Sequence, residues 1–229
     1  MARFYSEKSG LAPADISLDT IFFGGGTPSL MPAELVEAII DKAIGLFSAT
    51  PHIEITAEAN PTSVETAKIA DFAAAGVNRL SVGVQSLDKA GLSFLGREHS
   101  PDDALYALDI AQSHLQRVSC DMIYGLPDQT EAQWQSQLER LLARQLSHVS
   151  AYQLTIEAGT VFHSRTRKGE VLVADDDHVA SLYHLTEQIC AEAGLSAYEI
   201  SNYAADSAAS RHNLCYWRSG NWLAVGPGG

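Results

Sequence analysis

The chain has 229 residues, of which 46% are hydrophobic, and this length allows one domain with a sizeable core. Its 28 acidic and 15 basic residues give a formal net charge of -13, which disfavours nucleic acid and anionic membrane surfaces as partners. No apolar run reaches the roughly 20 residues that cross a bilayer, and Met1 to Gly10 lack the apolar core of a signal peptide. We therefore expect a cytoplasmic protein without a transmembrane segment.

Short β-branched or apolar runs alternate with capped amphipathic helices along most of the chain. Strands that alternate with helices form parallel sheets with right-handed crossovers, so the pattern predicts an α/β fold that closes as a barrel or stays open and doubly wound. In both cases functional residues gather at the carboxyl ends of the strands. The predicted strands are 20–23, 54–58, 79–84, 118–124 and 148–155.

The first predicted helix has Pro32 in its first turn, where proline is tolerated. Helical spacing predicts that its buried face consists of Leu35, Ile39, Ala43 and Phe47.

Helix caps mark the next elements along the chain. Ser63 is the predicted N-cap of a helix that stops at Gly76, and Ser100 is the predicted N-cap of the following helix. Thr130 and Gln133 have the spacing of a capping box. A polar stretch over 157–177 then precedes a helix of about 17 residues and a last strand over 197–203, which would close the sheet.

Three glycines, followed by Thr27, stand directly after the first predicted strand. Glycines at a strand end let backbone groups approach a ligand closely because no Cβ intervenes. A tight strand-to-helix turn is the more common meaning of a lone glycine triplet. The segment is not a P-loop, and it lacks the G-x-G-x-x-G spacing of dinucleotide-binding loops.

Polar residues also stand at or near the ends of the later strands, where a plain core would have apolar residues. They are Glu58 and Asn60, then Gln85, Arg97 and Asp121. Taken alone, either carboxylate would be a helix cap or a salt-bridge partner. Together these residues suit a zwitterionic ligand with hydroxyl groups, in which Arg97 meets a carboxylate and Glu58 or Asp121 meets an ammonium or a ribose diol.

Several motifs occur in the order found in the HemN and HemW families: GGGTPS, EANP, NRLSVGVQS, REHS, D-M-IYGLP and YQLTIEAGT. The chain resembles these families from Asp19 to Gly229. The resemblance implies a partial (β/α)6 barrel of the radical-SAM type that binds S-adenosylmethionine, whose amino and carboxylate groups ligate one iron of a 4Fe-4S cluster. It places Gly25 and Gly26 at the methionine amino group, Arg97 at its carboxylate, Gln85 and Asp121 at the ribose, and Thr27 and Glu58 beside the same ligand.

The cysteines do not supply the ligands of such a cluster. The families carry C-x-x-x-C-x-x-C ahead of the glycine strand, whereas Cys120, Cys190 and Cys215 are far apart here. We expect a truncated form, inactive as such, in which 1–18 is the remnant of a first helix and its connector. On the same resemblance, 19–195 would be the barrel core and 196–229 the start of a C-terminal region.

The run from Arg211 to Trp217 contains H-N-x-x-Y-W, which resembles the HemW pattern. Imidazole suits heme iron, so His212 is a candidate axial ligand, with Tyr216 and Trp217 as flat apolar surface for a porphyrin. Arg211 or Arg218 would then meet a propionate. A surface histidine beside aromatic residues that pack the end of the sheet is the alternative.

Three functions follow from these patterns. The resemblance favours a heme chaperone that delivers heme to an acceptor protein, and it leaves open whether the chain forms a homodimer. The second is oxygen-independent coproporphyrinogen III oxidase, an enzyme of porphyrin biosynthesis that uses S-adenosylmethionine. The third is a barrel enzyme acting on a phosphorylated metabolite, although no basic residue lies near the glycines.

Overall fold

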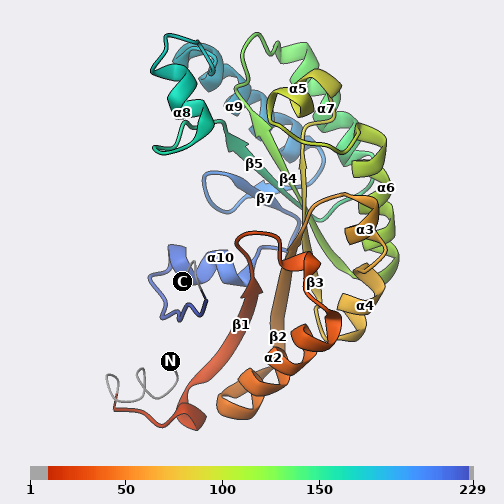
Figure 1. The fold of residues 1–229 in the computed structure, drawn as a ribbon, viewed down its shortest axis with the longest axis vertical. Helices are drawn as coiled ribbons and strands as arrows, with labels where there is room; N and C mark the ends of the chain where they lie inside the picture. Colours follow the sequence, from red (N-terminus) through yellow and green to blue (C-terminus); the bar gives the residue numbers. More distant parts are fainter. Residues whose placement is uncertain (1–9, 227–229) are drawn as a thin grey trace.

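A computed structural model describes residues 10–226, which form one curved sheet with helices on its convex side (Figure 1). The strand order is β1-β2-β3-β4-β5-β7-β6. Strands β1 to β5 are parallel to one another, whereas β7 pairs antiparallel with both β5 and β6. Their bounds are β1 Ser17–Phe23, β2 Ser48–Ala59, β3 Arg79–Gln85, β4 Arg117–Tyr124, β5 His148–Gln153, β6 Ser196–Ala197 and β7 Asn202–Ala204. The predicted partial barrel is confirmed.

Helices connect the consecutive strands from β1 to β6, as the βα pattern predicts. Two short 3-10 helices, η1 (Pro13–Asp15) and η2 (Pro28–Leu30), flank β1. The helices are α2 Ala33–Leu46, α3 Ser63–Thr66, α4 Ile69–Ala74, α5 Lys89–Phe94, α6 Pro101–His114, α7 Glu131–Leu142, α8 Val161–Thr166, α9 Asp176–Glu192 and α10 Arg211–Trp217. Within residues 10–226, no helix is both long enough and apolar enough to cross a membrane.

Two predicted helix caps are confirmed and one is wrong. Ser100 caps α6 and Thr130 caps α7, each in a capping box. Ser63 is the predicted N-cap of the next helix, but the N-cap is Thr62, whose side chain accepts from the backbone N–H of Glu65. That predicted helix is also two short helices, α3 and α4.

The predicted buried face of α2 is wrong at its first two positions, whereas Ala43 and Phe47 are partly buried. Val36 and Ile40 are 0% and 4% exposed, whereas Leu35 and Ile39 are 48% and 39% exposed. Both pairs have helical spacing, so the periodicity fits either face, and packing of the helix on the sheet selects one.

The last predicted strand is also different. Residues 197–203 do not form one strand, because the chain turns between β6 and β7. In this turn Glu199 accepts from the backbone N–H of Ser201 at 3.1 Å and from the Asn202 side chain. The sheet therefore continues past residue 195 with β7 antiparallel to both of its neighbours, β5 and β6.

The two faces of the sheet differ in polarity. On the convex side, large apolar side chains such as Leu108, Trp134 and Leu182 are fully buried. A small cavity on the other face is lined by polar side chains, among them Arg79, Ser119 and His148, which are also buried. Such polar lining is unlike the packed apolar interior of a complete barrel, and it leaves the inner face suited to a polar ligand.

Helix α10 lies on the concave side of the sheet (Figure 1), where a buried ion cluster holds it. Glu54 Oε2 lies 2.9 Å from Arg117 Nη1 and 3.9 Å from Arg79 Nη1. The other carboxylate oxygen of Glu54 accepts from the backbone N–H of His212 at 3.1 Å and from Ser210 Oγ at 3.4 Å. The cluster thus connects β2, β3 and β4 to the start of α10.

Candidate functional site

The glycine loop follows β1 and turns with left-handed backbone conformations. Gly25 and Gly26 have φ of 75° and 59°, which glycine adopts without strain. A Cβ on Gly24 would lie 2.7 Å from the Phe22 ring, so this position also requires glycine for space. The Gly25 N–H donates to Glu58 Oε2 at 3.3 Å. The three glycines are exposed and Thr27 is half-buried, so backbone groups face the rim of the sheet.

Glu58 and Asn60 stand at the end of β2, next to this loop. Burial raises the pKa of Glu58, and the hydrogen bond from Gly25 opposes that rise. Asn60 Oδ1 accepts from Arg97 Nη1 at 3.4 Å. Arg97 is exposed and forms no ion pair within the described part of the chain, so its charge is available to a ligand anion.

Gln85, at the end of β3, has a backbone conformation that is unusual for its residue type. Its φ is 65°, which costs a non-glycine residue on the order of 1 kcal/mol and occurs preferentially at functional sites. The Gln137 side chain supports this turn from α7 by accepting from Ser86 Oγ at 2.9 Å and from the Leu87 N–H at 2.7 Å. A Cβ on Gly83 would lie 2.8 Å from Gln85 Nε2, so glycine leaves room for this amide.

Asp121 lies on β4 and points into the concave side of the sheet. Ser81 Oγ lies 3.0 Å from both of its carboxylate oxygens. Burial raises the pKa of Asp121 to about 6, and the charge of Glu58 also raises it. Hydrogen bonds from Ser150 and Ser81 lower this pKa and partly offset the rise. Glu58 and Asp121 line the same small cavity, of about 50 Å³. A cationic ligand here would favour the ionised form of both carboxylates.

The register of the sheet brings these residues to one edge. Glu58 pairs with Ser81, and Gln85 pairs with Met122, the residue after Asp121. The predicted residues Gly25, Glu58 and Gln85 therefore stand at or just beyond the carboxyl ends of β1, β2 and β3. Asp121 lies inside the adjacent strand β4, and Arg97, which follows α5, reaches the end of β2 through Asn60.

A sequence model described as the radical SAM superfamily matches residues 11–141, more than half of the chain. The chain belongs to the radical SAM superfamily. Membership implies S-adenosylmethionine and a 4Fe-4S cluster as the cofactors of the family.

Individual proteins of this superfamily are also similar to the chain in sequence. Radical S-adenosyl methionine domain-containing protein 1, mitochondrial, of Bos taurus is 43% identical over 212 residues, covering 92% of this chain and 48% of the relative. Heme chaperone HemW of Escherichia coli is 38% identical over 210 residues, covering 91% and 54%. The chain thus spans about half the length of the curated relatives it matches. The predicted similarity to HemW is confirmed.

Solved structures of low sequence identity share the fold. Coproporphyrinogen III oxidase (HemN) from Escherichia coli matches with a TM-score of 0.73 at 20% identity, covering 88% of this chain and 46% of the oxidase. The archaeal Elp3 of Methanocaldococcus infernus matches with a TM-score of 0.61 at 18% identity, covering 82% and 48%. At these identities the matches support a shared radical SAM fold.

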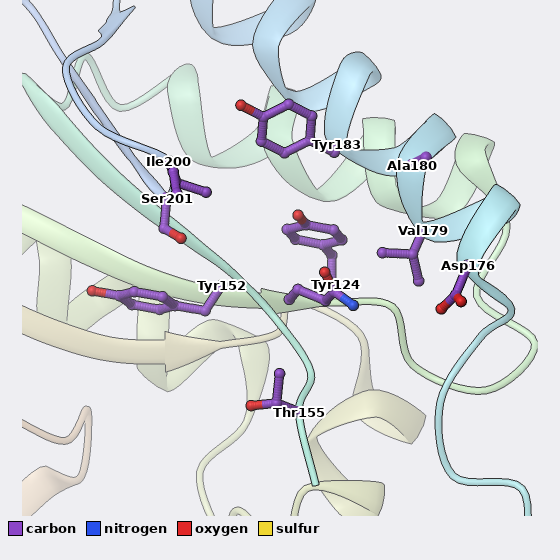
Figure 2. Close-up of a pocket in the computed structure, with 10 residues that line it drawn as sticks. Tyr124, Tyr152, Thr155, Asp176, Val179, Ala180, Tyr183, Ile200 and Ser201 are labelled. Atoms are coloured by element: carbon purple, nitrogen blue, oxygen red, sulfur yellow. The ribbon is translucent and has the colours of Figure 1, made fainter.

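A larger cavity of about 600 Å³ lies at the ends of β4 and β5, next to the small cavity (Figure 2). Its lining includes Tyr124, Tyr152 and Tyr183, and Tyr152 also lines the small cavity beside Asp121. Burial raises the pKa of Tyr124 to about 12, so its phenol is protonated at neutral pH. All ten lining residues are described, and they include no lysine or arginine. The cavity suits a flat, uncharged ring better than a phosphate.

The cysteines do not fit the 4Fe-4S cluster of the radical SAM family. Cys120 and Cys190 are fully buried, and burial raises the pKa of both thiols, to about 12 for Cys190. Iron–sulfur clusters require thiolates. Among residues 10–226, no group of three or more His, Cys, Asp or Glu residues is placed to hold a metal ion.

His212 anchors α10 to β1, and its stacking partner Phe22 lines the small cavity together with Glu58 and Asp121. Its Nδ1 is 3.2 Å from Thr20 Oγ1, and its ring stacks on Phe22 with the centroids 4.6 Å apart. Burial lowers the pKa of His212, and the negative charge of Glu54 partly offsets this by raising it. Thr20 pairs with Glu54 on β2, and the backbone N–H of His212 donates to Glu54 Oε1 at 3.1 Å.

Aromatic residues continue from His212 to the surface. The Tyr216 ring meets His212 edge-on at 5.1 Å and Trp222 at 5.5 Å. Tyr216 and Trp217 are exposed by 47% and 55%. His212, Tyr216 and Trp222 thus form one row of aromatic rings, and Trp217 is exposed on the same helix as His212 and Tyr216.

Several contacts in or next to the proposed ligand site were not predicted from the sequence. They are the Glu54 ion cluster, the 2.8 Å contact of His148 Nε2 with the Tyr198 hydroxyl, and the roles of Glu65 and Gln137. The partners are separated by long stretches of chain, so no local spacing indicates them. Only Thr62 and Glu65 had a local signal, because T-x-x-E is typical of a capping box.

Proposed function

We propose that this protein binds S-adenosylmethionine at the β1 to β4 rim and acts as a heme chaperone of the HemW type, delivering heme to an acceptor protein. The observation that carries the first part is the convergence of exposed glycine backbone, two carboxylates, an amide and an unpaired guanidinium at one edge of the sheet. The similarity to HemW relatives over nine-tenths of the chain supports the second part.

Each group at the rim has chemistry that matches part of the ligand. The Arg97 guanidinium suits the methionine carboxylate, and the backbone of Gly25 and Gly26, flanked by Thr27, suits the amino group together with Glu58. Asp121 and Gln85 suit the ribose hydroxyls, which donate hydrogen bonds to a carboxylate. The tyrosine-lined cavity suits the adenine ring, because aromatic side chains stack on flat bases.

Calorimetric titration tests the ligand. We expect S-adenosylmethionine to bind the chain with one site, and an Arg97→Ala variant to bind it about 10- to 100-fold more weakly, as loss of a charged hydrogen-bonding partner predicts. Ribose 5-phosphate serves as the control ligand and should give no heat of binding. Binding of the sugar phosphate without binding of S-adenosylmethionine would favour the metabolite enzyme instead.

Heme is proposed to bind at His212, with Tyr216 and Trp217 against the porphyrin. If the Nδ1–H donates to Thr20, the Nε2 lone pair faces away from that contact and can ligate iron. A His212→Ala variant should bind heme about tenfold more weakly, with a shifted Soret band, in a spectroscopic titration. His184→Ala, an exposed histidine on α9, is the matched control and should behave as wild type. An unchanged Soret band and affinity in His212→Ala would exclude His212 as a ligand.

The oxidase is the second candidate, and the shared fold is what favours it. The H-N-x-x-Y-W run and the names of the relatives favour the chaperone. The acceptor protein, a homodimer, the cytoplasmic location and the boundaries at residues 18 and 195 stay predictions.

A further inference from the structure

Glu65 is a buried carboxylate beside the rim, and it belongs to no ion pair among the described residues. It is 5% exposed and stands in α3. A buried carboxylate is costly unless hydrogen-bond donors surround it. Glu65 therefore depends on the donors that reach it from neighbouring loops.

Those donors come from two loops of the proposed ligand site. Ser29 Oγ, at the end of the glycine loop, donates to Glu65 Oε2. Asn60 donates through its backbone N–H at 2.7 Å and through its side-chain Nδ2 at 3.3 Å. Thr62 Oγ1 completes the set at 3.3 Å. One carboxylate thus joins the loop after β1 to the loop after β2.

The same contacts reach Arg97. Because Asn60 Nδ2 donates to Glu65, its Oδ1 is turned toward Arg97 and accepts from the guanidinium. A continuous chain of hydrogen bonds therefore runs from Ser29 through Glu65 and Asn60 to Arg97. An acceptor-only carboxylate imposes this orientation of the Asn60 amide, whereas a glutamine would also accept the reverse one.

A helix-capping role does not account for the Glu65 carboxylate. In a capping box it would accept from the backbone N–H of Thr62, but that N–H donates to Asn60 O at 2.8 Å. The carboxylate accepts from the loops instead.

We propose that Glu65 is a positioning residue for ligand binding. It holds the glycine loop through Ser29 and orients Arg97 through Asn60, so that the guanidinium faces the ligand carboxylate. This inference rests on the proposed binding of S-adenosylmethionine at the rim.

A double-mutant cycle tests the path to Arg97. Glu65→Gln should weaken binding of S-adenosylmethionine about tenfold in calorimetry, as expected for loss of a charged hydrogen-bond network. In an Arg97→Ala background the same substitution should have an effect at least about threefold smaller, because its target is gone. Glu37→Gln, an exposed glutamate of α2, is the matched control. Equal effects in both backgrounds, or wild-type affinity of Glu65→Gln, would overturn the proposal.

A second variant and a hydrogen-exchange experiment complete the test of Glu65. If Glu65→Gln does not fold, Asn60→Ala replaces it in the cycle and should show the same dependence on Arg97. Hydrogen exchange without ligand follows residues 24–31, which should exchange faster in Glu65→Gln than in Glu37→Gln. Unchanged exchange there would overturn the loop linkage. Failure of the wild-type chain to bind S-adenosylmethionine, with faster exchange in the variant, would reject the proposed function and leave the linkage standing.

Discussion

An Asp121→Asn variant is expected to be more stable than the wild-type protein at pH 7.5, by about 1 to 3 kcal/mol, and to bind S-adenosylmethionine about tenfold more weakly. Burial raises the pKa of Asp121 from 3.8 to about 6. The folded protein therefore holds this proton more tightly than the unfolded chain does, and the ionised carboxylate lowers the stability of the fold above pH 6. Asparagine removes that cost.

The pH dependence has a definite sign. Between about pH 4 and pH 6 the unfolded chain has already lost the Asp121 proton while the folded protein retains it, so this residue makes stability fall as the pH rises. The affinity for S-adenosylmethionine should rise over about pH 5 to 7, because the ionised carboxylate accepts hydrogen bonds from the ribose hydroxyls more strongly than the carboxylic acid does. The stability gain and the loss of affinity thus share one cause.

Denaturant unfolding at pH 4 and pH 7.5, with calorimetry across the same range, measures both effects. Asp41→Asn, which changes an exposed aspartate on α2, controls for the loss of one negative charge. The Asp121→Asn variant should match wild-type stability at pH 4 and exceed it at pH 7.5. A variant that is less stable at pH 7.5 would show that the carboxylate contributes to the fold.

A Glu54→Gln variant is expected to lose about 3 to 5 kcal/mol of unfolding free energy, because breaking a buried ion pair leaves the partner charges uncompensated. Glu54 and Arg79 are 1% and 3% exposed, so water does not replace the lost carboxylate at Arg79, whereas the Arg117 side chain is 27% exposed. The substitution also weakens the acceptor for the His212 N–H and Ser210 Oγ. Residues 211–217 should therefore exchange amide hydrogens faster.

Glu170→Gln is the matched control for this loss. Glu170 pairs with Arg165 at 2.7 Å, but both side chains are more than a third exposed. An exposed pair contributes about 0 to 1 kcal/mol, so this variant should unfold at nearly the wild-type denaturant concentration. If Glu54→Gln were equally mild, the buried cluster would not be what anchors α10.

Much of the site could be predicted from the sequence, because it follows from position along each strand. Gly25, Glu58, Gln85 and Asp121 were predicted from polar or glycine residues at strand ends, and parallel strands present those ends at one edge. The binding of S-adenosylmethionine by these residues stays a proposal. The positive φ of Gln85 had no local signal, since it depends on support from Gln137 in α7.

By itself, the sequence determined the alternation of strands and helices, two capping boxes, and a polar edge on a parallel sheet. Those features depend on the period of the hydrophobic pattern and on contacts between residues about four positions apart or closer, and the local sequence encodes both. Only the tertiary structure decided that α2 buries Val36 rather than Leu35, that the last strands run antiparallel, and that Glu65 connects two loops. These choices depend on how distant segments pack and which donors they bring together, and such information is absent from any short stretch of chain.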